Sequence, residues 1–155
     1  MFYIPFWILM AVFVLMALVA IFLRGFNFID FQVIVMIIAI SLTFDMVMCK
    51  WLNQYYSYVV TDTLKAFYSL IFCLIGYPAI GITYLKFLPA SWGKVLLYIV
   101  VWVAGLTILE ILTKPLGIVI YKTWKIIPYS PIIYVLSFAW EYGYYKVLQK
   151  HMRKV

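Results

Sequence analysis

The chain has 155 residues, of which 68% are hydrophobic and 11% are charged, and its formal net charge is +7. Its mean hydropathy is +1.10. A soluble domain carries about 25% charged residues, so this composition excludes an ordinary water-soluble domain and predicts a protein of the lipid bilayer. The basic residues lie between apolar runs rather than in one dense patch. That spacing argues against a nucleic-acid partner and is typical of charges that flank membrane helices.

Five apolar runs predict an all-α integral membrane bundle of five transmembrane helices, formed by a single domain over residues 1–155. The first run contains no charged residue from Phe2 to Leu23. At 1.5 Å rise per residue it spans roughly 33 Å, which is enough to cross a bilayer core. The predicted helices cover about residues 2–24, 28–49, 62–86, 92–113 and 131–149.

The second helix carries an acid at a position where lipid would make it costly. Ser41, Asp45 and Cys49 recur every four residues and therefore share one helical face. We expect this face to look into the bundle. Intramembrane acids are usually functional, whereas an acid near a helix end often only reaches the interface. Both alternatives apply to Asp45.

The third helix combines a stripe of small residues with a proline. The stripe runs from Ser69 to Thr83 and predicts a packing seam, since small side chains let membrane helices approach closely. Pro78 removes the backbone hydrogen bond to Leu74, so we expect a kink there. A plain kink is favoured over a break that lines a cavity.

The end of the fourth helix is the most informative stretch, because an apolar run stops at a carboxylate. Thr107, Glu110 and Lys114 lie on one stripe, and Pro115 follows. Glu110 and Lys114 are four residues apart with the acid first, the better order for an ion pair. The pair is either an interfacial salt bridge or a titratable, substrate-binding site. Residues 116–127 predict an interfacial segment or a short continuation of the helix after the kink.

The fifth helix is predicted to begin at Ser130 as N-cap with Pro131 in the first turn. It is the least apolar of the five, because Glu141 interrupts it. One face carries hydroxyls on either side of this acid, and we expect that face to pack against Thr107 and Glu110 of the fourth helix. An interfacial position for Glu141 is the alternative. The residues of that face are Tyr134, Ser137, Glu141 and Tyr145.

These patterns define a candidate intramembrane polar site and little else. No cofactor-binding motif or metal-ligand spacing occurs, and Cys49 and Cys73 form no CxxC pair. The one histidine, His151, lies in the tail, and no catalytic nucleophile is spaced with a base. We therefore expect no cofactor, no metal and no catalytic residue. The candidate site residues are Asp45, Glu110, Lys114, Tyr134, Ser137 and Glu141.

The basic residues also predict an orientation. Slightly more of them flank the side that holds the C-terminal tail, and Arg24 follows the first helix. The N-terminus is accordingly expected outside the cell membrane and the C-terminus in the cytoplasm. The chain length, the five spans, the LTKPLG break and the aromatic FAWEYGYYK segment resemble a family of small, uncharacterised multi-pass membrane proteins of spore-forming bacteria. The resemblance implies a bacterial cell-membrane protein and no mechanism.

Three functions are compatible with this sequence. The favoured one is a structural or interaction subunit whose partners are the lipid bilayer and either a second copy or another membrane protein. The first alternative is a small ion- or proton-coupled carrier that uses Asp45, Glu110 and Glu141 as inward acids. The second is a membrane-embedded lipid-modifying enzyme with Glu110 or Glu141 as base, which lacks a visible acid–base set.

Overall fold

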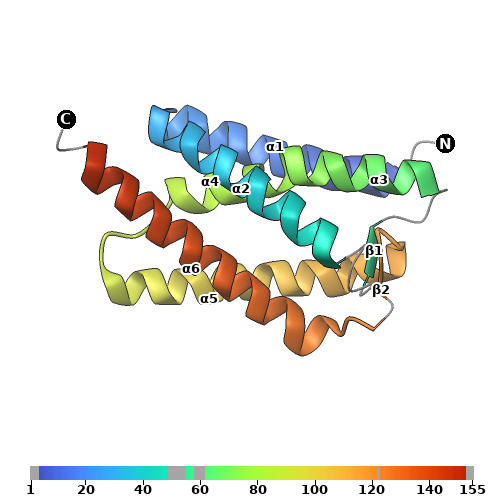
Figure 1. Cartoon of the computed structure of the whole chain (residues 1–155). Coiled ribbons are helices and arrows are strands. Elements are labelled where there is room, and N and C mark those ends of the chain that lie inside the picture. Colours follow the sequence, from blue (N-terminus) through green and yellow to red (C-terminus); the bar gives the residue numbers. More distant parts are fainter. Residues whose placement is uncertain (1–3, 49–54, 58–61, 122, 153–155) are drawn as a thin grey trace.

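The computed structural model describes residues 4–48, 55–57, 62–121 and 123–152, and its long elements are all helices, so the all-α prediction is confirmed. The helices are α1 (Ile4–Arg24), α2 (Phe28–Met46), α3 (Asp62–Ile71), η2 (Phe72–Gly76), α4 (Tyr77–Lys86), α5 (Trp92–Thr113), η3 (Lys114–Leu116) and α6 (Ile126–Met152). Two short strands are β1 (Tyr55–Ser57) and β2 (Val119–Tyr121). Successive long helices run in opposite directions along the bundle, and α3, η2 and α4 follow one another in the same direction (Figure 1).

Within the described part of the chain, four helices are long and apolar enough to cross a membrane, namely Ile4–Arg24, Phe28–Met46, Phe67–Lys86 and Trp92–Leu116. Many of their large apolar side chains are exposed on the outside of the bundle. A bilayer is the solvent for which such a surface is suited. Helix α6 has 27 residues but is too polar to be counted with these four.

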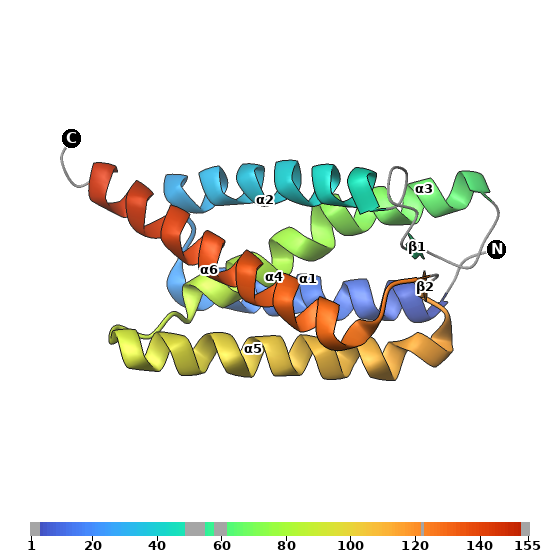
Figure 2. The same ribbon diagram turned by 60° about the horizontal axis from the view of Figure 1, so that its bottom comes forward.

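Helix α4 forms the centre of the bundle. It contacts α1, α2 and α6, and every residue from Pro78 to Leu85 is buried. The predicted seam of small residues therefore lies inside the protein. Tyr84 is completely buried, stacks on Tyr98 with ring centroids 5.4 Å apart, and donates a hydrogen bond to the carbonyl of Phe138 (3.3 Å). Figure 2 shows α4 crossing obliquely behind α6.

The helical segment formed by α3, η2 and α4 is interrupted by a π-helical turn, whereas the sequence predicts only a kink at Pro78. The backbone N–H of Tyr77 donates to the carbonyl of Phe72, five residues earlier. Because Pro78 has no N–H for the carbonyl of Leu74, the ordinary pattern cannot continue through this turn. Single π-turns of this kind are frequent at functional sites, and Phe72 lines the cavity described below.

Beyond Leu116, the described residues of the segment 116–127 do not continue the fourth helix, so that alternative is wrong. Helix α5 passes into the short η3 turn, which ends at Gly117 in a left-handed conformation (φ 66°). Strand β2 follows and pairs antiparallel with β1, with Tyr55 opposite Tyr121 and Ser57 opposite Val119. The glycine permits the reversal, and β-branched residues favour an extended backbone after it.

Helix α6 also begins earlier than its proline predicts. Its regular part follows Ile127, whose backbone is extended (φ −104°, ψ 126°), so Ser130 and Pro131 lie inside the helix. Pro131 is tolerated because it falls in the first turn after this break, where few backbone N–H groups have helical partners. Ser130 is therefore not an N-cap, and its hydroxyl is available for other contacts.

A buried ion pair joins α2 to α4 at the end of the bundle opposite the strands. Asp30 is 0% exposed, and its Oδ2 lies 2.5 Å from Lys86 Nζ. The same carboxylate accepts a hydrogen bond from the backbone N–H of Asn27 (2.7 Å), and the Asn27 side chain accepts one from Asp30 N–H (3.0 Å). This reciprocal capping box fixes the first turn of α2.

Candidate functional site

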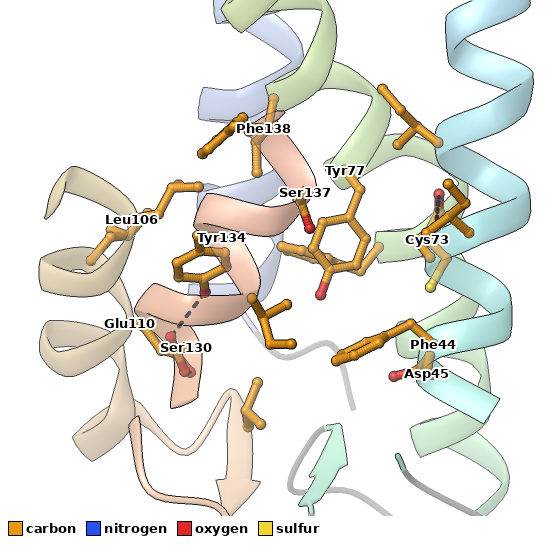
Figure 3. Close-up of a pocket in the computed structure, with 18 of the residues that line it drawn as sticks. Phe44, Asp45, Cys73, Tyr77, Leu106, Glu110, Ser130, Tyr134, Ser137 and Phe138 are labelled. Atoms are coloured by element: carbon orange, nitrogen blue, oxygen red, sulfur yellow. Dashed lines mark hydrogen bonds between the residues drawn. The ribbon is translucent and has the colours of Figure 1, made fainter. Parts of the chain in front are cut away.

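A cavity of about 570 Å³ lies between α2, η2, α5 and α6, with β2 at one end. The three acids that the sequence places inside the bundle, Asp45, Glu110 and Glu141, all line it. In Figure 3, Glu110 lies on one side with Ser130 and Tyr134, while Asp45 lies on the opposite side. Tyr134 and Ser137, the other predicted members on α6, line the same cavity.

Glu110 is held by hydroxyl groups from three directions. Tyr121 on β2 donates to its Oε1 (2.5 Å), Ser130 donates to the same oxygen (3.0 Å), and Tyr134 donates to Oε2 (2.9 Å). Trp124 in turn donates its indole N–H to the Ser130 hydroxyl (3.0 Å). An ionised carboxylate is an acceptor only, so three O–H donors satisfy much of its capacity inside an apolar bundle.

The surroundings of Tyr121 favour its protonated phenol, which is the form that can donate a hydrogen bond. Burial raises the pKa of Tyr121 above its ordinary value of 10.0, and the hydrogen bond to Glu110 and the negative charge of Glu110 raise that pKa further. The neutral phenol is therefore favoured throughout the physiological pH range, and it can donate its proton to the carboxylate in a hydrogen bond.

Asp45 faces α3, as its position on the helix predicts. Ser69 donates its hydroxyl to Asp45 Oδ2. One turn earlier, Ser41 donates to the carbonyls of Ile38 (3.1 Å) and Cys73 (3.4 Å). The predicted inward face of α2 is thus confirmed for its two described members, while Cys49 lies outside the described residues.

Glu141 lies beside α4 rather than beside Glu110. An ideal Cβ built on Gly81 of α4 would come within 3.1 Å of Glu141 Oε2, which shows how closely the carboxyl group approaches that backbone. Seven residues separate Tyr134, which contacts Glu110, from Glu141, a rise of about 10 Å along α6. The expected packing of this face on α5 therefore holds for Tyr134, whereas Glu141 turns to the neighbouring helix.

Lys114 does not belong to this group. Its side chain is exposed, and no ion pair joins it to Glu110 within the described part of the chain. The α-helix ends at Thr113, and Lys114 begins the η3 turn. The carboxylate is instead satisfied by hydroxyls, so the predicted salt bridge is replaced by neutral donors.

Several contributors were not identified from the sequence. The sequence predicts Ser69 in the packing seam and Ser130 at an N-cap. It predicts Tyr121 and Trp124 in the segment 116–127, which is either interfacial or a continuation of the fourth helix. One physical signal could have found some of them: a carboxylate placed in lipid requires donors, and hydroxyl side chains flank the break after Glu110. No group of His, Cys, Asp and Glu side chains suited to a metal ion occurs among the described residues.

No family model matches the chain, and no curated protein or solved structure is detectably similar to it. The site must be interpreted from its own chemistry. The resemblance to small multi-pass membrane proteins of spore-forming bacteria remains an expectation.

Proposed function

We propose that this protein is a small carrier of the cell membrane that takes an apolar or amphiphilic molecule into the cavity between α2 and α6. The single observation that carries the proposal is a cavity inside the bundle onto which Asp45, Glu110 and Glu141 converge. Its volume is within the range of about 300–1,000 Å³ typical of small-molecule sites. Acids inside a membrane protein are expensive to keep and mark substrate or ion pathways.

The opening of the cavity supports entry from the bilayer. Ile40 on α2 and both Leu136 and Trp140 on α6 line it, and these three side chains are 44%, 60% and 59% exposed. They lie on the outer, lipid-suited surface of the bundle, so a molecule dissolved in the membrane would reach the cavity between α2 and α6 without crossing the aqueous phase.

The proposal includes α6 as a fifth transmembrane helix, with the N-terminus outside and the C-terminus in the cytoplasm. Its 27 residues correspond to about 40 Å of helix. Three of its polar side chains lie inside the bundle, because Ser130 and Tyr134 contact Glu110 and Glu141 lies against Gly81. The end of the bundle that holds Arg24 and Lys94 is placed in the cytoplasm by the positive-inside rule.

Cysteine labelling tests this topology. In a chain whose Cys49 and Cys73 are replaced by alanine, we expect Lys114→Cys to react with a membrane-impermeant maleimide added outside intact cells. Lys94→Cys and Lys150→Cys should react only after the membrane is permeabilised. All three side chains are exposed in the structure, so access depends on the membrane. Labelling of Lys114→Cys and Lys150→Cys from the same side of the membrane would contradict five spans.

Blocking the cavity tests the function. Ser137 is exposed and projects across the cavity toward Tyr77 (Figure 3), so Ser137→Phe should fill the space. We expect wild-type protein in lipid nanodiscs to bind radiolabelled triphenylphosphine oxide or tetraphenylphosphonium saturably and with 1:1 stoichiometry. The Ser137→Phe variant should lose this binding. Ala139→Phe is the matched control, because Ala139 is exposed on the same helix and does not line the cavity.

A second candidate function is an interaction subunit, and an apolar groove that adjoins the cavity favours it. The groove has a volume of about 700 Å³ and lies between α1 and α5, where Val12, Met16, Val101 and Leu106 are among its apolar walls. A second copy of the chain or another membrane helix would pack against such an apolar surface. Equal probe binding by wild type and Ser137→Phe would refute the carrier proposal and leave the interaction subunit as the better explanation.

A further inference from the structure

Glu141 differs from the other two acids of the cavity in its hydrogen bonding within the described part of the chain. Glu110 accepts three hydroxyl hydrogen bonds, and Asp45 accepts one from Ser69. The Oε2 atom of Glu141 is completely buried and receives no hydrogen bond from the described part of the chain. A buried acceptor without a donor is costly and calls for a specific explanation.

The backbone of α4 provides the space for this carboxyl group. Gly81 is buried, and a side chain there would overlap Ile37 Cδ1 and approach Glu141 Oε2 to 3.1 Å. A glycine inside a helix is less favourable than an alanine. At this position it lets an acid lie against the helix, where the described residues offer its Oε2 no hydrogen-bond donor.

The charges around the cavity all have one sign. Asp45, Glu110 and Glu141 line it, and no lysine, arginine or histidine among the described residues does. Lys86 is engaged by Asp30 elsewhere in the bundle, and Lys114 is exposed. No basic side chain among the described residues is therefore placed to pair with Glu141. A cation that entered the cavity would supply the opposite charge, and attraction between opposite charges is strong in such a low-dielectric site.

The rest of the lining suits an organic cation better than a hydrated metal ion. Most lining residues are apolar, and the aromatic rings of Phe44, Tyr77, Tyr134 and Phe138 are among them. Aromatic faces attract cations and recognise quaternary ammonium groups in particular. A volume of about 570 Å³ accommodates a ligand with several apolar substituents.

We propose that the cavity binds a lipophilic organic monocation, with Glu141 as its counter-charge and the aromatic side chains around its apolar body. This inference rests on the proposed function, since it names the chemical class of the molecule that the carrier would take. The cation enters from the bilayer between α2 and α6 and places its charge beside the carboxyl group that Gly81 accommodates.

Probes of equal shape and different charge test this inference with the full chain in nanodiscs. Tetraphenylphosphonium and tetraphenylborate are nearly equal in size and opposite in charge, and triphenylphosphine oxide is neutral. For each probe, the signal from nanodiscs that contain Ser137→Phe is subtracted, which corrects for probe molecules that partition into the lipid. We expect wild type to bind the phosphonium about tenfold more tightly than the borate, or better.

Variants at Glu141 test whether this residue causes the preference for the cationic probe. Glu141→Gln keeps the shape and should weaken phosphonium binding about tenfold or more, and it should weaken the binding of neutral triphenylphosphine oxide much less. Glu141→Asp, which keeps the charge, should retain part of the preference. Equal binding of phosphonium and borate by wild type, or an unchanged phosphonium affinity in Glu141→Gln, would overturn the inference. If the neutral probe still binds in either case, the carrier proposal survives; if no probe binds above the blocked variant, both proposals fall.

Discussion

Replacement of Lys86 by methionine is expected to lower the free energy of unfolding by about 3 kcal/mol or more. Lys86 Nζ lies 2.5 Å from Asp30 Oδ2, and the Asp30 side chain is essentially inaccessible. Methionine keeps the apolar stem of the lysine and removes its charge. The carboxylate then remains buried with the Asn27 N–H as its donor, which is the situation that makes removal of one partner so destabilising.

The measurement is equilibrium unfolding of the purified chain in mixed detergent micelles. Lys94→Met is the matched control, because Lys94 is exposed near the same end of the bundle, and it should change stability by less than about 0.5 kcal/mol. Asp30→Asn combined with Lys86→Met should recover part of the loss, since the amide carries no charge. Equal stability of Lys86→Met and Lys94→Met would show that the pair does not hold α2 and α4 together.

Replacement of Glu110 by leucine is expected to cost about 3 kcal/mol, because it leaves three hydroxyl groups without their acceptor at once. Hydrogen bonds to a charged group contribute roughly 1.5–3 kcal/mol each and are not additive. Tyr121, Ser130 and Tyr134 come from different elements. The variant should therefore also loosen β2 from α5, which limited proteolysis near Tyr121 would detect together with the unfolding midpoint.

Lys114→Leu serves as the control for the Glu110 variant. Its position is one turn further along the chain and its side chain is exposed. If Lys114→Leu alone lowers the free energy of unfolding strongly but adds no further loss to Glu110→Leu in the double variant, the ion pair predicted from the sequence is supported. A loss confined to Glu110→Leu supports the hydroxyl cluster, and the single variants Ser130→Ala and Tyr134→Phe should each show a smaller part of it.

The helices were predictable because each depends on a local pattern. An apolar run preceded by Ser91 and ended near Pro115 predicts 92–113, and the structure has Trp92–Thr113. The π-turn and the strand pair were not predictable in this way. Strand pairing joins Tyr55 to Tyr121, and no local rule connects segments so far apart in the chain. The ion pair between Asp30 and Lys86 has no local signature for the same reason.

The site shows the same division between local and distant information. The inward acids could be found because a carboxylate in a lipid-embedded helix is costly wherever it occurs. Of the partners of Glu110, Tyr134 was predictable from the expected packing of the fifth helix on the fourth. Tyr121 and Ser130 were not, because they reach Glu110 across 11 and 20 positions of the chain without a local pattern that connects them to it. The role of Gly81 is likewise seen only from its closeness to Glu141.

The π-turn at Phe72–Gly76 determines how the side chains of α3 and α4 are aligned around their common axis. An α-helix turns by about 100° per residue, and a π-turn accommodates one extra residue within the helix. Ser69 before the turn and Gly81 after it therefore face nearly the same way as they would in a regular helix with one residue fewer between them. Deleting one exposed residue of the turn, such as Leu74, should convert it into a regular α-helical turn and keep the Ser69 hydroxyl directed at Asp45. A further inserted residue would instead rotate Ser69 by about 100° relative to Gly81 and remove its hydrogen bond to Asp45. This wall of the cavity should therefore tolerate the loss of one residue better than the gain of one.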